Sequence, residues 1–220
     1  MNKELLREYM DYRCSMYFWL KNLYIIEPSA SVLIDIMESC KMFGDESELP
    51  DKEREFISFF ASLDNKKAAL LAKDIRPEYA RLFLGPKKVI APPYESVYRS
   101  NSKQLFGVSS IEVRRYYQIM GLQINTMGSE PDDFIGFELE FMYYLAFLTI
   151  KAIDENRDEE LEKLFKYQYE FSKGHISSWI QEFTNDIYEN TEMEYFRVLA
   201  KFTNEFILTD YEFLTELNKA

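Results

Sequence analysis

The feature that most constrains the fold is a helical repeat of apolar residues that continues along almost the whole chain. In residues 5–24, leucine, methionine and tyrosine side chains recur at intervals of three and four residues, which places them on one face of an α-helix. Only seven glycines and seven prolines interrupt the 220 residues, so long helices are favoured over strands joined by tight turns. No linker rich in glycine, serine or proline divides the chain. The sequence therefore predicts an all-α fold, a single-domain bundle of about ten helices over residues 1–220.

Capping residues and prolines predict several helix boundaries. Ser29 is a good N-cap for a helix over residues 29–43, which Gly44 is expected to end. Pro77 has the position of a first-turn proline, and it is expected to begin a separate short helix over residues 77–84.

The second half of the chain carries further boundary signals. Ser109 and Glu112 have the spacing of a capping box, and Gly121 is expected to end the helix that they begin. The most hydrophobic helix is predicted over residues 134–153, and a short terminal helix is predicted around residues 211–217.

Charge and composition restrict the classes of partner. The formal net charge of -12 disfavours nucleic acids and anionic membrane surfaces, because both need clustered lysine and arginine, whereas it suits basic peptides. Residues 1–13 are charged throughout and lack the apolar region of a signal peptide. The longest apolar run, residues 141–148, is too short to span a bilayer. We therefore expect a cytoplasmic protein in which Cys14 and Cys40 are reduced thiols.

The sequence contains no pattern typical of a catalytic or metal site. His175 is the only histidine, which removes most histidine-based sites, and its place one helical turn before Trp179 indicates packing or capping. Residues 154–165 lack the glycine and the glutamate of a calcium-binding loop. Glu138 and Glu140 are expected on different helix faces. We expect neither enzyme activity nor a bound cofactor or metal.

Two segments break the helical repeat. The first, residues 79–98, reads YARLFLGPKKVIAPPYESVY, and its Tyr79, Leu82 and Phe83 fall on one face of a helical turn. The prolines that follow are expected to hold the backbone extended. A segment of this kind either connects two helices or forms a binding surface, and the residues of this segment alone leave both readings open.

The second segment, residues 129–133, reads SEPDD and precedes the most hydrophobic helix. One acid is sufficient to cap a helix and complement its dipole, so three exceed that need. Acids beside an apolar, aromatic groove would suit a ligand with a basic end and an apolar body.

Together the two segments resemble the TorD/DmsD family of redox-enzyme maturation chaperones, which is related to the nitrate-reductase assembly chaperones. The resemblance covers about residues 75–185. The matching residues of the first segment are Tyr79, Leu82, Phe83, Gly85, Pro86, Pro92, Tyr94, Glu95, Ser96, Val97 and Tyr98. Those of the second part are Glu130, Pro131, Asp132, Glu138, Leu139, Phe141 and Met142, with a weaker match at His175 and Trp179.

The resemblance implies an all-helical cytoplasmic chaperone without catalytic chemistry. Such a protein binds the twin-arginine signal peptide of a molybdopterin-containing oxidoreductase and delays export until the cofactor is inserted. Some members also contact the body of that enzyme, and some form homodimers. In this chain the peptide-binding residues implied by the resemblance are Tyr79, Leu82, Phe83, Gly85, Pro92, Tyr94, Ser96, Tyr98, Glu130, Pro131, Asp132 and Asp133. The acids among them would face the arginine end of the peptide. Asp133 occupies the position where the family commonly has histidine, which adds a carboxylate.

Three alternatives stay open. In the first, the protein is an assembly chaperone whose client enzyme is not exported, as in the nitrate-reductase branch. In the second, the protein is a helical adaptor that does not bind leader peptides. The third alternative is an α-helical enzyme that binds a metal through Glu130, Asp132, Asp133 or Glu138, and the single histidine disfavours it.

Overall fold

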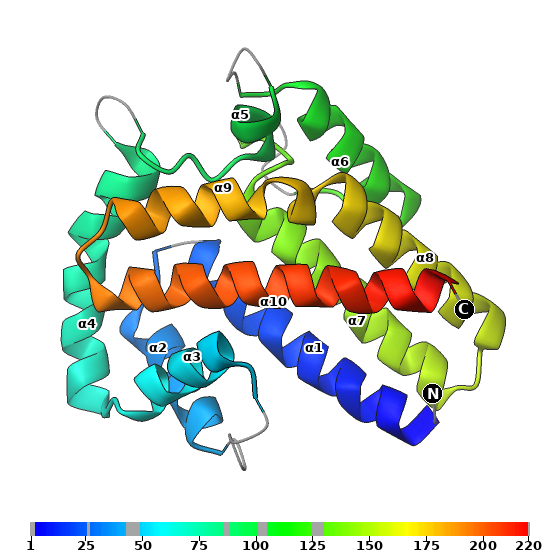
Figure 1. Ribbon diagram of the computed structural model, residues 1–220, viewed down its shortest axis with the longest axis horizontal. Coiled ribbons are helices and arrows are strands. Elements are labelled where there is room, and N and C mark those ends of the chain that lie inside the picture. The colour runs from blue at the N-terminus through cyan, green and yellow to red at the C-terminus, as the bar shows by residue number, and fades with distance from the viewer. Residues whose placement is uncertain are drawn as a thin grey trace. The chain divides into compact units, whose positions relative to one another are not determined.

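The computed structural model describes residues 3–25, 27–42, 49–85, 89–100, 105–124 and 130–219. Within these residues the chain forms ten α-helices, one π-helical turn and no β-strand, which confirms the predicted all-α class and helix number (Figure 1). In chain order they are α1 (Lys3–Tyr24), α2 (Ala30–Lys41), α3 (Asp51–Ala61), α4 (Asn65–Tyr79), the π-helical turn η2 (Ala80–Leu84), α5 (Glu95–Arg99), α6 (Val108–Ile119), α7 (Ile135–Asp154), α8 (Asp158–Gly174), α9 (Ile176–Glu189) and α10 (Glu194–Lys219). Gly44, Pro86 and Ser129 lie outside the described residues.

The chain divides into two compact units. Unit 1 contains Met1–Lys21, Tyr94–Trp179 and Thr209–Ala220, and unit 2 contains Asn22–Pro93 and Ile180–Leu208. The expectation of a single domain over the whole chain stays a prediction.

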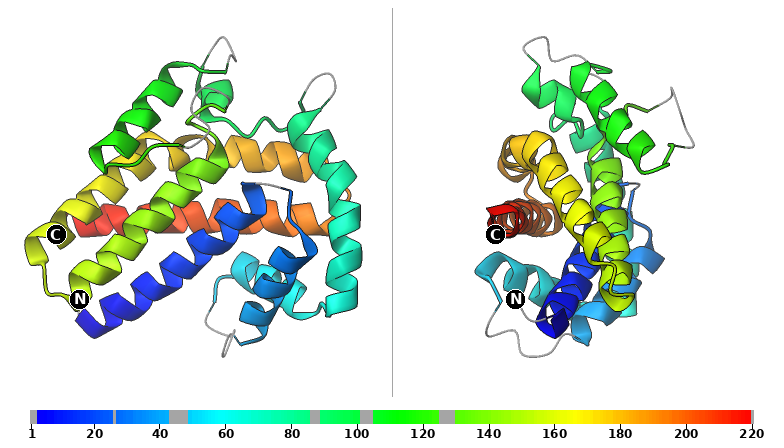
Figure 2. Two further views of the ribbon diagram at one scale, coloured as in Figure 1. Left: turned by 180° about the vertical axis from the view of Figure 1, so that it is seen from behind. Right: turned by 90° about the vertical axis from the view of Figure 1, so that its right-hand side faces the viewer.

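In unit 1, helices α1 and α7 run antiparallel and side by side (Figure 2). Lys21 Nζ lies 3.1 Å from Glu140 Oε1 near the start of α7, and Arg7 Nε lies 2.7 Å from Asp154 Oδ1 at its end. Helix α7 also packs against α8, and it buries most of its side chains, as its hydrophobic sequence predicts. The exposed Glu140 and the buried Glu138 lie on different faces of α7, as expected.

The core of unit 1 contains a buried ion pair between α1 and α10. Arg13 and Asp210 are both almost fully buried, and Arg13 Nη2 lies 2.8 Å from Asp210 Oδ2. Arg13 Nη1 also donates to Gln168 Oε1 of α8 at 2.8 Å, and the Tyr17 hydroxyl donates to Asp210 Oδ2 at 2.6 Å. Both charged groups therefore keep hydrogen-bonding partners inside the helical core.

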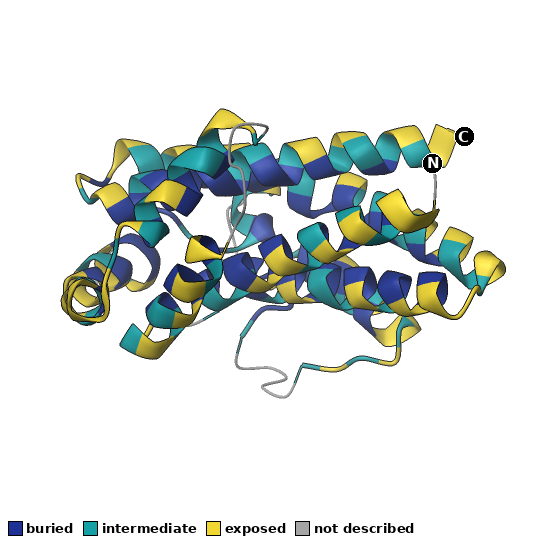
Figure 3. Ribbon diagram, turned by 90° about the horizontal axis from the view of Figure 1, so that it is seen from below, coloured by how far each residue is buried: buried dark blue, intermediate teal, exposed yellow. Residues whose placement is uncertain are grey.

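Unit 2 has an aromatic core. Helix α2 packs against α3 and α4, and the ring of Phe56 on α3 stacks on that of Phe202 with centroids 4.2 Å apart. The side chain of Ser29 accepts a hydrogen bond from Val32 N at 3.4 Å, which confirms the predicted N-cap of α2. Figure 3 shows that helices of the protein carry buried residues on one face and exposed residues on another, as amphipathic helices do.

The prediction that Pro77 begins a separate helix was wrong, because Pro77 lies inside α4. Ile75 and Tyr79, on either side of the proline, are both buried, so the same apolar face continues through it and stabilises the helix. Beyond Tyr79 the chain widens into the π-helical turn, where Gly85 N donates to Ala80 O at 2.7 Å.

Three further local predictions need correction. Helix α10 continues to Lys219, so residues 211–217 are not a separate helix; the buried ion pair of Asp210 explains the charge that interrupts the apolar pattern there. Helix α6 begins at Val108 after Gly107 and has no side-chain N-cap, so Ser109 lies too far inside the helix to begin a capping box. The backbone after the prolines is extended at Tyr94, whereas residues 95–99 form the short helix α5.

Two glycines offer a matched test of backbone strain. Gly121 ends α6, as predicted, with a φ of 71°, and a Cβ added there meets no atom within 4 Å. We expect Gly121→Ala to lower the free energy of unfolding by roughly 1–2 kcal/mol through backbone strain alone. Gly174 also has no atom within 4 Å of an added Cβ, and it lies in α8. We expect Gly174→Ala to raise the free energy of unfolding by about 0.4–1 kcal/mol. Urea titration of both variants measures the two effects; a loss at Gly174 equal to that at Gly121 would contradict the assignment to strain.

Neither cysteine forms a disulfide, in agreement with the sequence prediction. Cys14 lies on α1 in unit 1, where burial, followed by the charge of Asp11, raises its pKa to about 11. Cys40 lies on α2 in unit 2 and is buried. Both thiols are therefore protonated or inaccessible in the folded chain.

Candidate peptide-binding site

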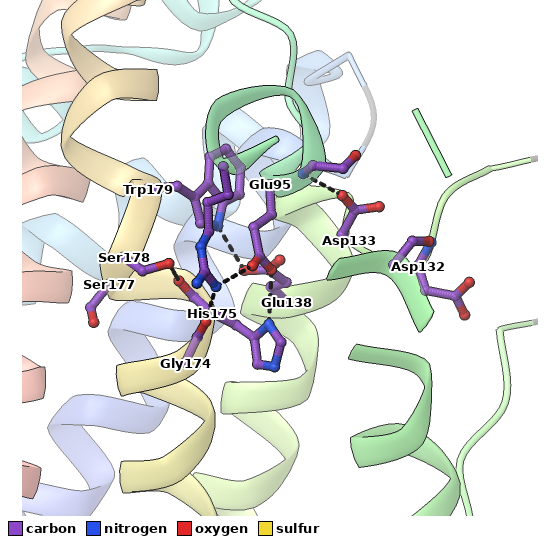
Figure 4. Close-up of polar contacts among 12 residues, drawn as sticks. Glu95, Asp132, Asp133, Glu138, Gly174, His175, Ser177, Ser178 and Trp179 are labelled. Carbon is purple, nitrogen blue, oxygen red and sulfur yellow. Dashed lines mark hydrogen bonds and ion pairs between the residues drawn. The ribbon is translucent and has the colours of Figure 1, made fainter. Parts of the chain in front are cut away.

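The structure joins the second half of the first irregular segment to the SEPDD segment, within unit 1. Tyr94 and Phe134 form an isolated antiparallel bridge, and their rings lie 5.8 Å apart. Glu95 N donates to the Asp133 carbonyl at 3.1 Å, and Ser96 N donates to Asp133 Oδ2 at 2.6 Å (Figure 4). Because these bonds involve the backbone of both segments, they fix the segments to one another without depending on surface side chains.

The three predicted acids have different environments. Glu130 is partly exposed, and the hydroxyl of Tyr94 donates a hydrogen bond to its Oε1. Asp132 is buried, and its Oδ2 accepts from Arg114 Nε at 3.0 Å and Nη2 at 2.5 Å. Asp133 is fully buried and accepts the bond from Ser96. Glu130 is therefore the acid with the most open carboxylate.

Helix α6 holds the backbone of the second segment. Ser110 Oγ accepts from Asp132 N at 3.0 Å, and the Tyr117 hydroxyl donates to the Asp132 carbonyl at 3.1 Å. Together with the Arg114 ion pair, these contacts place Asp132 against α6, while Pro131 is also buried. The segment has a fixed conformation on its α6 side.

The twelve predicted peptide-binding residues fall in both units. Tyr79, Leu82, Phe83, Gly85 and Pro92 belong to unit 2, and Tyr94, Ser96, Tyr98, Glu130, Pro131, Asp132 and Asp133 belong to unit 1.

In unit 2, the three apolar residues of the predicted groove are buried. Tyr79 is 7% exposed and Phe83 is 4% exposed, while Leu82 is fully buried. The Tyr79 hydroxyl donates to the Tyr24 carbonyl at 3.1 Å, and the Tyr79 and Phe83 rings meet edge-on at 4.9 Å. These side chains contribute to the core of unit 2, and their contact with a peptide stays a prediction.

A network that the sequence did not indicate lies beneath α5. His175, between α8 and α9, places Nδ1 2.9 Å from Glu95 Oε2. Arg99 Nη1 donates to Glu95 Oε1 at 2.8 Å and also to the Gly174 carbonyl. On α9, the ring of Trp179 stacks on Tyr98 with centroids 5.5 Å apart. Helix α5 is thus anchored to α8 through Arg99 and to α9 through Tyr98, and Glu95 bonds to His175 between those two helices (Figure 4).

The same network extends to α7 through Glu138. Trp179 Nε1 donates to Glu138 Oε2 at 3.2 Å. Burial, together with the charges of Glu95 and Asp133, holds the pKa of Glu138 well above its usual range. Burial also raises the pKa of Glu95, but the hydrogen bond and charge of His175, with those of Arg99, outweigh it and hold that pKa below its usual range. The pKa values of the two buried glutamates are therefore shifted in opposite directions: that of Glu138 is raised and that of Glu95 is lowered.

These residues were absent from the predicted site for a physical reason. Glu95 and His175 are 80 positions apart, so no local spacing indicates their contact. The available signal was a glutamate next to Ser96 and a single histidine before a tryptophan, which alone indicates packing. The assignment of His175 to the helix of Trp179 also needs adjustment, because His175 follows α8 and precedes α9.

Within the described ranges, no three histidine, cysteine, aspartate or glutamate side chains are grouped so that they could hold a metal ion. None of the helices in the described part of the chain combines the length and apolarity needed to cross a membrane.

Comparison with known proteins assigns the family. The sequence model of the family described as nitrate reductase delta subunit matches residues 45–185, which is more than half of the chain. The chain belongs to the nitrate reductase delta subunit family. The matched range includes both irregular segments, and also Glu138, His175 and Trp179.

Curated relatives carry the names of chaperones. A protein of Haemophilus influenzae named probable Tat proofreading chaperone DmsD is 28% identical over 185 residues, which cover 82% of this chain and 81% of its own length. Chaperone protein TorD of Vibrio vulnificus is 23% identical over 214 residues, 95% of this chain and 97% of its own. Chaperone protein TorD of Vibrio cholerae is 24% identical over 210 residues, 93% of each chain. The resemblance to the TorD/DmsD family is confirmed.

Proposed function

We propose that this protein is a cytoplasmic chaperone for a molybdopterin-containing oxidoreductase, that it binds the enzyme's twin-arginine signal peptide, and that it delays export until the cofactor is inserted. The observation that carries the proposal is the family match, which spans both irregular segments, together with relatives named as chaperones, one of them for Tat proofreading. The direct contact of the two segments in unit 1 supports a shared site.

The surroundings of Glu130 suit an arginine side chain. A partly exposed carboxylate lies beside the ring of Tyr94, which in turn contacts the ring of Phe134. A guanidinium group can bond to a carboxylate and lie over an aromatic ring at the same time. The net charge of -12 also attracts a basic peptide over longer distances.

The other predicted residues receive different roles in this proposal. Asp132 and Asp133 fix the backbone of the segment that carries Glu130, because their carboxylates already have protein partners. Tyr79, Leu82 and Phe83 are assigned to the apolar stretch of the peptide, as the resemblance implies. Contact with the body of the client enzyme, and a homodimer, belong to the same proposal.

Titration calorimetry with synthetic leader peptides tests the proposal. We expect binding of a leader that carries the arginine pair, and weaker binding when lysines replace both arginines, because lysine cannot make the bidentate contact. Equal affinity for a scrambled peptide of the same composition would contradict recognition of a leader. The scrambled peptide keeps the charge of the leader, so it measures how much of the affinity comes from charge alone.

Glu130→Gln should weaken leader binding about tenfold, which is the loss expected for one charge-assisted contact of about 1.4 kcal/mol. Glutamine retains an acceptor for the Tyr94 hydroxyl, so the local structure is preserved. The salt dependence of binding should also become shallower. Glu182→Gln, at an exposed position on α9, makes the same change in net charge and is the matched control. Equal effects of both variants would mean that only the overall charge acts.

A second candidate function follows from the description of the matched family. The family is described by the delta subunit of nitrate reductase, which favours an assembly chaperone whose client is not exported. That protein would bind the folded client without preference for an arginine pair. Calorimetry with the oxidoreductase encoded beside this gene, with and without its N-terminal segment, distinguishes the two functions.

A further inference from the structure

Three acidic side chains are buried together beneath α5. Glu95, Asp133 and Glu138 come from α5, the SEPDD segment and α7, and each has an exposed fraction of 0% (Figure 4). Among the described residues, two basic side chains reach this cluster, His175 and Arg99, and both bond to Glu95. Glu138 therefore lies next to an ionised carboxylate without a basic partner of its own among the described residues. A further buried negative charge in that position, without a counter-charge, would be costly.

The oxygen atoms of Glu138 show where a proton is needed. Oε2 accepts a hydrogen bond from Trp179 Nε1 at 3.2 Å. No donor from the described residues reaches Oε1, although that atom is buried. The side chain of Glu138 lies beside that of Glu95 (Figure 4), whose carboxylate can accept a further hydrogen bond, since an ionised carboxylate has about four acceptor positions. A proton on Glu138 would turn the orphaned oxygen into a donor and would remove the uncompensated negative charge of Glu138.

We propose that Glu138 holds a proton that it donates to the Glu95 carboxylate, and that this pair is the positioning element that keeps α5 in place for peptide binding. Glu95 begins α5, and α5 carries Ser96 and Tyr98, so any displacement of Glu95 moves both. The proton on Glu138 concerns only the fold of unit 1, whereas the positioning of α5 for peptide binding rests on the proposed function. Glu95 and Glu138 act through α5 and need no contact with the peptide.

The pH dependence follows from the groups that face Glu138 and its neighbour Glu95. These are Glu95 and Arg99 from α5, Asp133, His175, Trp179 from α9, and Tyr117 from α6. The raised pKa of Glu138 means that the folded chain keeps a proton which the unfolded chain releases above its ordinary pKa of 4.5. Stability therefore falls as pH rises from that value, until Glu138 ionises in the folded state. The Glu138→Gln variant, which cannot ionise at this position, isolates the contribution of Glu138 to that pH dependence.

Infrared spectroscopy of the full chain tests the proton directly. At pH 7 we expect the carbonyl absorption of a protonated carboxylic acid in the wild type, and its loss in Glu138→Gln. Glu140→Gln, two residues along α7 at an exposed position, should keep the absorption. Carbon-13 labelling of the glutamate carboxyl groups gives the same information by NMR without any variant. Ionised signals from every glutamate at pH 7 would overturn the inference.

Leader affinity measured between pH 6 and pH 9 tests the positioning role. We expect the wild-type affinity to fall with rising pH by about tenfold, while Glu138→Gln binds within about twofold of the wild type at pH 6 and has a flatter profile. The melting temperature should show the same contrast without any peptide. Parallel pH profiles of the two proteins would overturn the positioning role.

The outcomes also separate this inference from the proposed function. If no leader binds the wild type at any pH, the proposed function fails and the peptide-binding half of the inference fails with it. The infrared band and the pH profile of the melting temperature then still decide whether Glu138 holds the proton that fixes α5.

Discussion

Replacing Arg13 by alanine should lower the free energy of unfolding by about 3–5 kcal/mol, because the change leaves a buried carboxylate without its counter-charge. Asp210 is 1% exposed, and Arg13 is its basic partner in the core of unit 1. The loss also removes the donor to Gln168 and the contact of the guanidinium with the ring of Phe213. Urea unfolding followed by circular dichroism measures the effect.

Two further variants show whether burial is the cause. Arg7 lies on the same helix and pairs with Asp11 and Asp154 near the surface, so Arg7→Ala should cost no more than about 1 kcal/mol. The double replacement Arg13→Met with Asp210→Leu should recover most of the stability, since it removes both charges together. A similar loss in Arg7→Ala and Arg13→Ala would refute the special role of the buried pair.

The second large effect is expected in unit 2, where Phe83→Ala should lower the free energy of unfolding by about 3–5 kcal/mol. The Phe83 ring contacts those of Tyr24, Tyr79, Phe183 and Phe196, with centroids between 4.9 and 6.3 Å away. Removing it leaves a cavity among aromatic side chains that cannot all move to fill it. Thermal and urea unfolding measure the loss.

The neighbouring residue is the control. Leu84 is in the same π-helical turn but is 63% exposed, so Leu84→Ala should change stability by less than about 0.5 kcal/mol. Leader affinity of Phe83→Leu, measured where the variant is folded, then tests the predicted peptide contact separately from the core. Stability unchanged in Phe83→Ala would contradict the packing seen around the ring.

Much of the fold could be predicted because the apolar repeat of an amphipathic helix can be recognised within a few turns of sequence. Helix α7 appears as a continuous apolar sequence, while Ser29 begins α2 and Gly121 ends α6 through local capping chemistry alone. The prediction at Pro77 was wrong because α4 continues through the proline only if the side chains on both sides of Pro77 are buried. That burial is a tertiary effect.

The candidate site could be predicted only where its residues are close in sequence. The two segments stood out because each breaks the helical pattern, and their contact at Asp133 was the part that local sequence could not supply. Arg13 and Asp210 are 197 positions apart, and an arginine on a helix usually indicates an exposed face. Polar partners of this kind carry no periodic signal, so the structure is needed to identify them.

The two cysteine thiols should react slowly with reagents while the chain is folded. At neutral pH only about one Cys14 thiol in ten thousand is ionised, given a pKa of about 11, and Cys40 is shielded from solvent. An alkylating reagent should therefore react slowly with Cys14, which is half-buried and protonated, and should reach Cys40 only after the surrounding helices separate. Cys14 belongs to unit 1 and Cys40 to unit 2. The alkylation rate of each thiol should therefore report how often the unit that contains it opens.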